Sequence, residues 1–137
     1  MIFLDTNVVS DTLKRAPSEA VLAWFVRFDA ELALPTVTIA EIAFGIQEIR
    51  PYERADRLAQ GLAEWRRRFA GRIFGLTEAA ALAYGEIMGQ AVREDRPISV
   101  PDGMIAAIAG VNGGRLATRN IRDFTGAGIE LVDPWAF

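Results

Sequence analysis

The chain has 137 residues with a net charge of −3, and 51% of its residues are hydrophobic, which suits a single domain with its own core. It contains no cysteine and no histidine, which excludes disulfides, thiolate metal sites, cysteine nucleophiles and any mechanism that uses an imidazole. No apolar run approaches the about 18 residues of a membrane-spanning helix. We therefore expect one cytoplasmic domain over residues 1–137, with no membrane contact.

Short apolar runs alternate with helical patterns along the chain. We expect strands at residues 1–4, 31–34, 72–75, 115–117 and 129–132. Apolar residues recur at helical spacing within residues 38–49, 51–69, 77–93 and 103–111. Pro51 suits the first turn of the second of these helices, and Thr77 suits the N-cap of the third. This alternation predicts an α/β fold, a three-layer α/β/α sandwich with a central, mostly parallel sheet.

Three acidic residues stand alone among apolar neighbours. Asp5 follows the first strand, Glu41 lies in the run 37–44, and Asp102 follows Pro101 near a helix start. All three can reach the carboxyl edge of the sheet, where such folds bind ligands. Two carboxylates about 4 Å apart repel by about 4 kcal/mol at an effective dielectric constant of about 20. If the three meet, the natural partner is therefore a hard divalent cation.

Each acid also has a simpler interpretation. Asp is a favoured N-cap, so Asp5 and Asp102 suit helix starts that have no further role. Glu41 suits the solvated side of its helix, about 130° from the centre of the apolar stripe.

Basic residues are concentrated in one segment of this acidic chain. Residues 50–72 contain seven arginines and three acids, a net charge of +4. Such a segment favours contact with a polyanion, and the alternative is a solvated helix face.

Four segments together resemble a known family. They are MIFLDTNVVS at 1–10, TIAEIAFGI at 38–46, DGMIAA at 102–107, and LATRN at 116–120 with Asp123-Phe124 after it. In order and spacing they resemble the motifs of PIN-domain ribonuclease toxins of the VapC family, especially the FitB-like branch. The closing Val132-Asp133-Pro134-Trp135 is also typical of that branch. The resemblance covers essentially the whole chain.

This resemblance implies an Mg²⁺- or Mn²⁺-dependent endoribonuclease, the toxin of a type II toxin–antitoxin system. It implies a metal site made of Asp5, Glu41 and Asp102, with Thr118 orienting a ligand or the attacking water. Asn120 stands where the fully acidic pattern has an aspartate, and Asp123 supplies a nearby acid. Because an amide carries no charge, the resemblance leaves open whether one metal ion binds or two. For RNA contact we single out four arginines, namely Arg66, Arg67, Arg68 and Arg119.

The resemblance also implies partners: an RNA substrate, a cognate antitoxin, and DNA only through that antitoxin. We expect a homodimer, and a larger assembly with the antitoxin. Adjacent aromatic residues on a helix, such as Trp24 and Phe25, predict that at least one ring is available to a partner. Trp65 and Phe69, which lie one turn apart, are further aromatic residues that we expect to be available to a partner. The alternative is that loops of the same chain cover them.

Other readings of the acids are weaker. A phosphorylated receiver domain needs a lysine near its aspartate, and the only lysine is Lys14 in the first helix. A haloacid-dehalogenase-type phosphatase needs a second aspartate two residues after the first, where this chain has Asn7. The serious rival is a metal-inactive, PIN-like protein that binds nucleic acid or a partner.

Overall fold

The sheet fixes the positions of all other elements. In the computed structural model, which describes all 137 residues, five strands form one parallel sheet in the order β3-β2-β1-β4-β5. The strands are β1 (Ile2–Leu4), β2 (Leu32–Pro35), β3 (Ile73–Phe74), β4 (Arg115–Ala117) and β5 (Leu131–Val132). All five predicted strands are therefore confirmed, although several are shorter than the predicted ranges.

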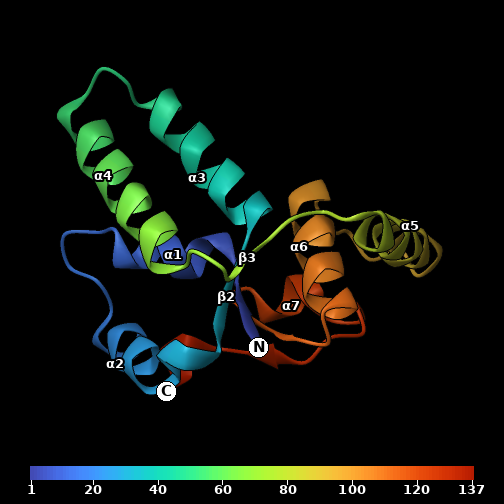
Figure 1. Ribbon diagram of the computed structural model, residues 1–137. Helices are drawn as coiled ribbons and strands as arrows, with labels where there is room; N and C mark the ends of the chain where they lie inside the picture. Colours follow the sequence, from blue (N-terminus) through green and yellow to red (C-terminus); the bar gives the residue numbers. More distant parts are fainter.

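Alternating side chains of the strands supply two separate cores. Ile2 and Leu4 of β1 point into one core, and Phe3 points into the other. In β4, Ala117 joins the first core and Leu116 the second. Because both faces of the sheet are apolar, helices must cover both. Figure 1 shows this arrangement, with α1 to α4 on one side and α5 to α7 on the other. The predicted three-layer sandwich is confirmed.

The four predicted helices are confirmed, although the one expected at 103–111 begins at Val100, and three further helices lie outside the predicted ranges. The first face carries α1 (Thr6–Thr12), α2 (Glu19–Phe28), α3 (Thr36–Glu48) and α4 (Glu53–Arg68). The second carries α5 (Glu78–Arg93), α6 (Val100–Val111) and the short α7 (Ile121–Phe124). Two 3-10 turns span Asp29–Glu31 and Pro134–Ala136. None of the helices is both long and apolar enough to cross a membrane.

The starts of α5 and α4 test the predicted roles of Thr77 and Pro51. The Thr77 hydroxyl accepts a hydrogen bond from the backbone N–H of Ala80, so its role as N-cap of α5 is confirmed. The prediction for Pro51 was wrong, because α4 begins at Glu53 and Pro51 lies in the turn before it. The preceding backbone is a tight connection between α3 and α4, and Tyr52 takes the cap position.

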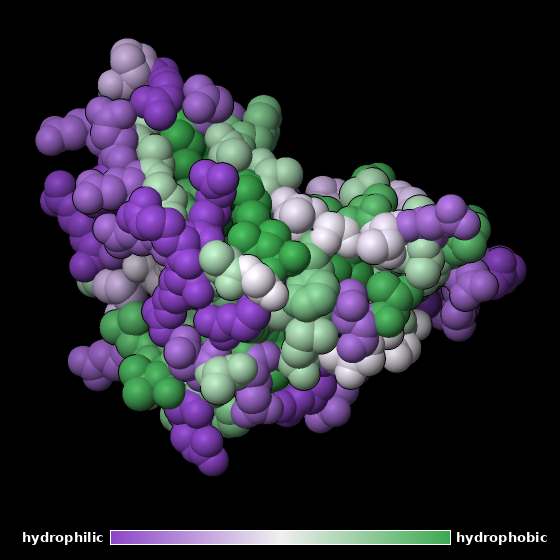
Figure 2. All heavy atoms as spheres, in the orientation of Figure 1, coloured by the Kyte–Doolittle hydropathy of each residue, from purple (hydrophilic) through white to green (hydrophobic).

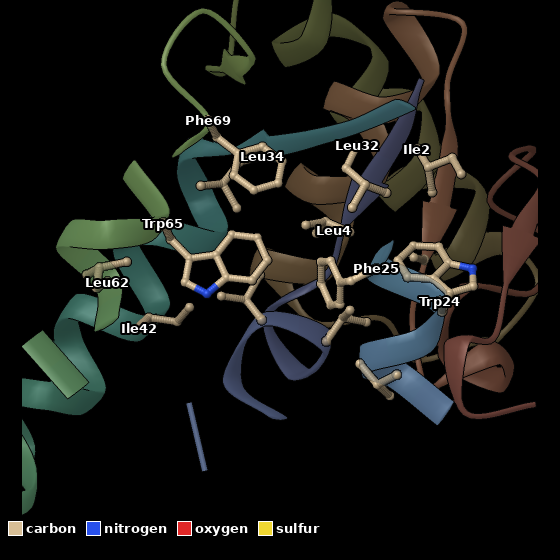
Figure 3. Close-up of a cluster of buried hydrophobic side chains, with 14 of the residues drawn as sticks. Ile2, Leu4, Trp24, Phe25, Leu32, Leu34, Ile42, Leu62, Trp65 and Phe69 are labelled. Carbon is tan, nitrogen blue, oxygen red and sulfur yellow. The ribbon is translucent and has the colours of Figure 1, made fainter. Parts of the chain in front are cut away.

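The first core contains the aromatic residues that the sequence predicted to be partly free. Trp24 and Phe25 are 1% and 5% exposed, so the prediction that one of them faces a partner was wrong. Phe25 meets Trp65 edge-on at 5.1 Å between ring centroids, while Trp24 contacts Phe28 at 5.6 Å. Neighbouring helix positions differ by about 100°, and the core covers more than that angle of α2. Figure 3 shows the cluster.

Trp65 links α4 to this core and to α1, so its removal should destabilise the fold. Its ring stacks on Phe69 at 4.9 Å, and its indole N–H donates to the Thr12 hydroxyl at 3.1 Å. We expect Trp65→Ala to lower the free energy of unfolding by about 3–5 kcal/mol. Trp65→Phe keeps a ring and should cost about 1–2 kcal/mol. Urea unfolding measures both, and equal costs would contradict this account of the packing.

Candidate active site

Asp5 is the first residue after β1 and is only 3% exposed. Its backbone N–H donates to the carbonyl of Ala117, which continues the sheet by one bond at 3.0 Å. Its carboxylate accepts from the backbone N–H of Thr6 at 2.8 Å and therefore caps α1, as the simpler interpretation expected. It also accepts from the Asn7 amide at 3.0 Å and from the Thr118 hydroxyl at 2.7 Å. Capping is thus only part of the role of this carboxylate.

The loop after β4 is attached to Asp5 by these side chains. Thr118 is fully buried, and its hydroxyl both donates to Asp5 and accepts from the backbone N–H of Asn120 at 3.0 Å. The side-chain oxygen of Asn7 accepts from the backbone N–H of Arg119 at 3.2 Å. Because β1 and β4 are parallel neighbours, these residues meet at one edge of the sheet.

Glu41 reaches the same edge from α3. The Thr38 hydroxyl, in the first turn of α3, donates to the carbonyl of Leu4 at 2.8 Å and fastens the helix to the end of β1. Glu41 lies three residues later, on the same side of the helix. Its carboxylate accepts from the Thr6 hydroxyl at 2.5 Å and is partly buried. Glu41 is therefore not a solvated surface residue.

Asp102 belongs to the first turn of α6. The cap of this helix is Ser99, whose hydroxyl accepts from the backbone N–H of Asp102 at 3.2 Å. The interpretation of Asp102 as an N-cap was therefore wrong. The next residue, Gly103, lies where a Cβ atom would come within 2.6 Å of the sulfur of Met88. This glycine lets the start of α6 approach α5 closely, and it sets the position of the neighbouring Asp102.

The acids lie close enough to influence one another electrostatically. The pKa of the Asp102 carboxyl is raised from 3.8 to about 6, first by burial and then by neighbouring negative charges. The carboxylates responsible are those of Asp5, Glu41 and Asp123, in that order. Burial likewise raises the pKa of Asp5, to which Glu41 adds a smaller repulsion.

No basic side chain forms a salt bridge with any of these four acids. The donors that hold Asp5 and Glu41 are neutral hydroxyl, amide and backbone groups. Oxygen ligands with excess negative charge suit Mg²⁺ or Mn²⁺. The acids do not converge into a complete cage of three side chains. Mg²⁺ does not need one, because it usually keeps several waters and binds one or two carboxylates. The donor set therefore fits such an ion.

The remaining predicted residues lie at the rim. Asn120 is exposed at the N-cap position of α7 and is tied to the site through its backbone. Asp123 is exposed in α7 but close enough to raise the pKa of Asp102. The guanidinium of Arg119 lies 4.9 Å from the centroid of the Trp135 ring, on the loop that carries Thr118.

The structure does not bring the three consecutive arginines to the carboxylates. Arg66, Arg67 and Arg68 form the last turn of α4. Arg68 pairs with Asp29 at 2.5 Å and lies over the Trp65 ring at 5.8 Å. Arg66 and Arg67 line hollows that do not include Glu41. Their contact with RNA stays a prediction.

Sequence reasoning assigned no role to the residues that position the acids. Thr6 holds Glu41, Asn7 joins Asp5 to the loop after β4, and Thr38 anchors α3. One available signal was the polar run Asp5-Thr6-Asn7 directly after an apolar strand. The other was a threonine one helical turn before Glu41.

The chain is similar to known proteins over almost its whole length. Residues 2–128 match the family model described as the PIN domain. The chain is 36% identical over 137 residues to VapC ribonuclease Y4jK of Sinorhizobium fredii, with 98% of each chain covered. It is 34% identical over 140 residues to Toxin FitB of Neisseria gonorrhoeae, with 98% of this chain and 99% of that protein covered. The crystal structure of FitAcB from Neisseria gonorrhoeae matches with a TM-score of 0.91, 32% identity and 100% of both chains covered.

The raised pKa of Asp102 predicts a pH-dependent stability in the absence of metal. Because its pKa is higher in the folded chain, about 6 against 3.8, the folded state holds the proton more tightly. This contribution is complete below pH 3.8 and is lost as the pH rises through about 6. In EDTA, we expect the melting temperature of the wild type to fall more than that of Asp102→Asn over this range.

Thermal melts in EDTA from pH 4 to 7 measure this difference, and added Mg²⁺ at pH 7 should then raise the wild-type melting temperature more than that of the variant. Parallel pH profiles for the two proteins would show that the pKa of Asp102 is not raised in the folded chain.

Proposed function

The chain belongs to the PIN-domain family, in its VapC and FitB group of toxins, and we propose that it is an Mg²⁺- or Mn²⁺-dependent endoribonuclease. The observation that carries this proposal is the group of four carboxylates at one sheet edge without a basic partner. The substrate class follows from the ribonuclease name of the relative in Sinorhizobium fredii.

Each residue has a role that its contacts support. The oxygens of Asp5 are held by three donors, so the carboxylate is oriented before any ligand arrives. Asp102 projects from the first turn of α6 as the second direct ligand. Glu41 uses one oxygen to accept from Thr6, and its other oxygen is available to hold a water. A bound divalent ion would supply a positive charge that polarises the phosphoryl group and favours ionised water.

Residues at the rim contact the RNA strand in this proposal. The amide of Asn120 can donate to a phosphate oxygen without adding negative charge. Asp123 adds a second carboxylate beside Asp102. Thr118 acts as a positioning residue, because its hydroxyl is buried between Asp5 and the backbone of Asn120. Attack by water on phosphorus leaves a 5′-phosphate and a 3′-hydroxyl.

A metal-inactive binding protein is the alternative function. Asn120 favours this alternative, because an amide at this position gives the site one negative charge fewer than an aspartate would. Calorimetric titration with Mg²⁺ and Mn²⁺ separates the two, since a binding protein with a vestigial site takes up neither ion.

Loss of one ligand charge should abolish cleavage without loss of the fold. We expect Asp102→Asn to lower the rate of RNA cleavage by at least about 100-fold, or about 2.7 kcal/mol of barrier. The matched control is Asp56→Asn, an exposed carboxylate on α4 that pairs with Arg50 and lies outside the group of four acids. Cleavage of total RNA, with sequencing of the product ends, is the measurement. Cleavage by the wild type in excess EDTA would contradict the metal mechanism.

We also propose partners. The relative named Toxin FitB and the solved structure of FitAB bound to a DNA fragment support an antitoxin as partner, with DNA contact only through it. An arginine from the antitoxin is a suitable inhibitor, because it would pair with the acids that lack a basic partner. A homodimer is supported by exposed apolar side chains on α3, in the turn before α4 and on α5, namely Phe44, Tyr52, Leu82 and Val92.

Light scattering tests both assemblies. The purified chain should have twice its own mass of 15.0 kDa, and co-expression with the product of the neighbouring upstream gene should give a heavier complex. Co-expression should also relieve inhibition of growth. A mass of one chain at micromolar concentration counts against the dimer. Failure to co-purify, with growth still inhibited, counts against the toxin–antitoxin pair even if cleavage is observed.

A further inference from the structure

A groove of about 390 Å³ lies between α1, α3 and α4, and Glu41 is the one of the four acids that lines it. Thr6 and Glu41 line one end of it. Apolar side chains of α3 and α4 line its middle, among them Ile46 and Leu58. Basic residues also line the groove, namely Lys14, Arg15, Arg54 and Arg57. The acidic site and these bases therefore share one continuous surface.

The basic end opens into a second hollow, which we call the basic hollow. Its volume is about 600 Å³, and its lining consists of four residues without an apolar side chain: Arg15, Glu53, Arg54 and Arg57. All four are exposed. Figure 2 shows how hydrophilic side chains gather over the outer side of α4. The basic hollow is thus a charged surface next to a catalytic groove.

The three arginines of the basic hollow make no salt bridge, unlike Lys14 and Arg50 nearby. Lys14 pairs with Asp11 at 3.2 Å, and Arg50 pairs with Asp56 at 3.0 Å. Arg54 and Arg57 lie three residues apart and so share one side of α4. Unpaired guanidinium groups on one surface are suited to bidentate contacts with phosphate.

We propose that Arg15, Arg54 and Arg57 bind backbone phosphates of the RNA strand whose scissile bond lies at Asp5 and Asp102. This inference rests on the proposed ribonuclease function. Along α3, the groove extends from Glu41 to Ile49, eight residues or about 12 Å. At about 3.4 Å per nucleotide of a stacked strand, a groove of this length accommodates three or four nucleotides.

Peptide binding is the competing occupant, and the lining of the groove separates the two. Its apolar middle also suits a peptide, but the basic hollow has no apolar side chain to anchor one. Polyanion contact, in contrast, needs only accessible positive charge. The position of these arginines also distinguishes them from Arg66 and Arg67, which line hollows away from Glu41.

The experiment measures binding in EDTA, where cleavage does not interfere. A labelled single-stranded RNA of about a dozen nucleotides is titrated at several salt concentrations. Each lost phosphate contact should flatten the slope of log K against log salt by about 0.7 for a single strand. We therefore expect Arg54→Ala/Arg57→Ala to flatten the slope by about 1.4, and Arg15→Ala by about 0.7.

Two further double variants serve as controls, because each removes two positive charges, as Arg54→Ala/Arg57→Ala does. Arg27→Ala/Arg93→Ala changes exposed arginines on α2 and α5, outside the groove, and should leave the slope unchanged. Arg66→Ala/Arg67→Ala tests the end of α4. Equal flattening by all three pairs would indicate a diffuse field and overturn the proposal. Flattening by Arg66→Ala/Arg67→Ala alone would transfer the contact there and overturn it too.

Two more measurements separate this proposal from the ribonuclease function and from peptide binding. If the wild type cleaves RNA with Mg²⁺ and Arg54→Ala/Arg57→Ala cleaves it with the same KM, the phosphate contact is wrong while the function stands. If the wild type binds RNA but does not cleave it, the proposed function fails by itself. An unchanged RNA slope with weakened binding of a co-purified partner protein would make the basic hollow a protein contact. Unchanged melting temperatures of the variants confirm that they fold.

Discussion

The hydrogen bond from the Thr118 hydroxyl to the Asp5 carboxylate joins residues 113 positions apart, and the rest of the site depends on it. It requires β1 and β4 to be parallel neighbours, with Leu4 paired to Ala117. Only in that register do the residues that follow the two strands leave the sheet at the same level. A shift by one residue would turn the side chains of β4 to the opposite face and remove the contact. The pairing of these two strands is therefore a condition for the site.

Neutral donors hold the acids, which leaves the charge of the site uncompensated. Hydroxyl and amide groups donate to the carboxylate of Asp5, and a hydroxyl donates to that of Glu41, but these groups add no positive charge. The raised pKa of Asp102 reflects its burial first and the repulsion by neighbouring carboxylates second. The pair of Arg68 with Asp29 shows the contrasting arrangement, in which a base of the same chain offsets the acid. A site with four acids and no base is suited to a cation that the chain does not itself contain.

Sequence patterns predicted those features that depend on local chemistry. Strand positions follow from short apolar runs, and the position of Asp5 at the sheet edge follows from the apolar run that ends just before it. Features that depend on which elements become neighbours were not predictable in this way. The role of Thr38 depends on the carbonyl of Leu4 being within reach of α3, and the burial of both Trp24 and Phe25 depends on how far the core extends round α2. The prediction for Pro51 was wrong because the fixed φ angle of proline suits a turn as well as the first turn of a helix, and here Pro51 lies in the turn before α4.

The net charge of residues 50–72 identified a basic segment, but it does not tell which side of the helix each arginine occupies. Arg66 lies nine residues after Arg57, which places it about 180° round the helix. The net charge of the segment acts at long range in either case, because it steers any polyanion toward α4. Short-range phosphate contacts depend instead on the side of α4 that faces α1 and α3, and that side includes Arg54 and Arg57. At the other end Arg68 is engaged with Asp29 and the Trp65 ring, so it fixes α4 in place. One basic helix thus has an arginine that is engaged with the fold at its end, Arg68, and unpaired arginines at its start, along the groove that leads to Glu41.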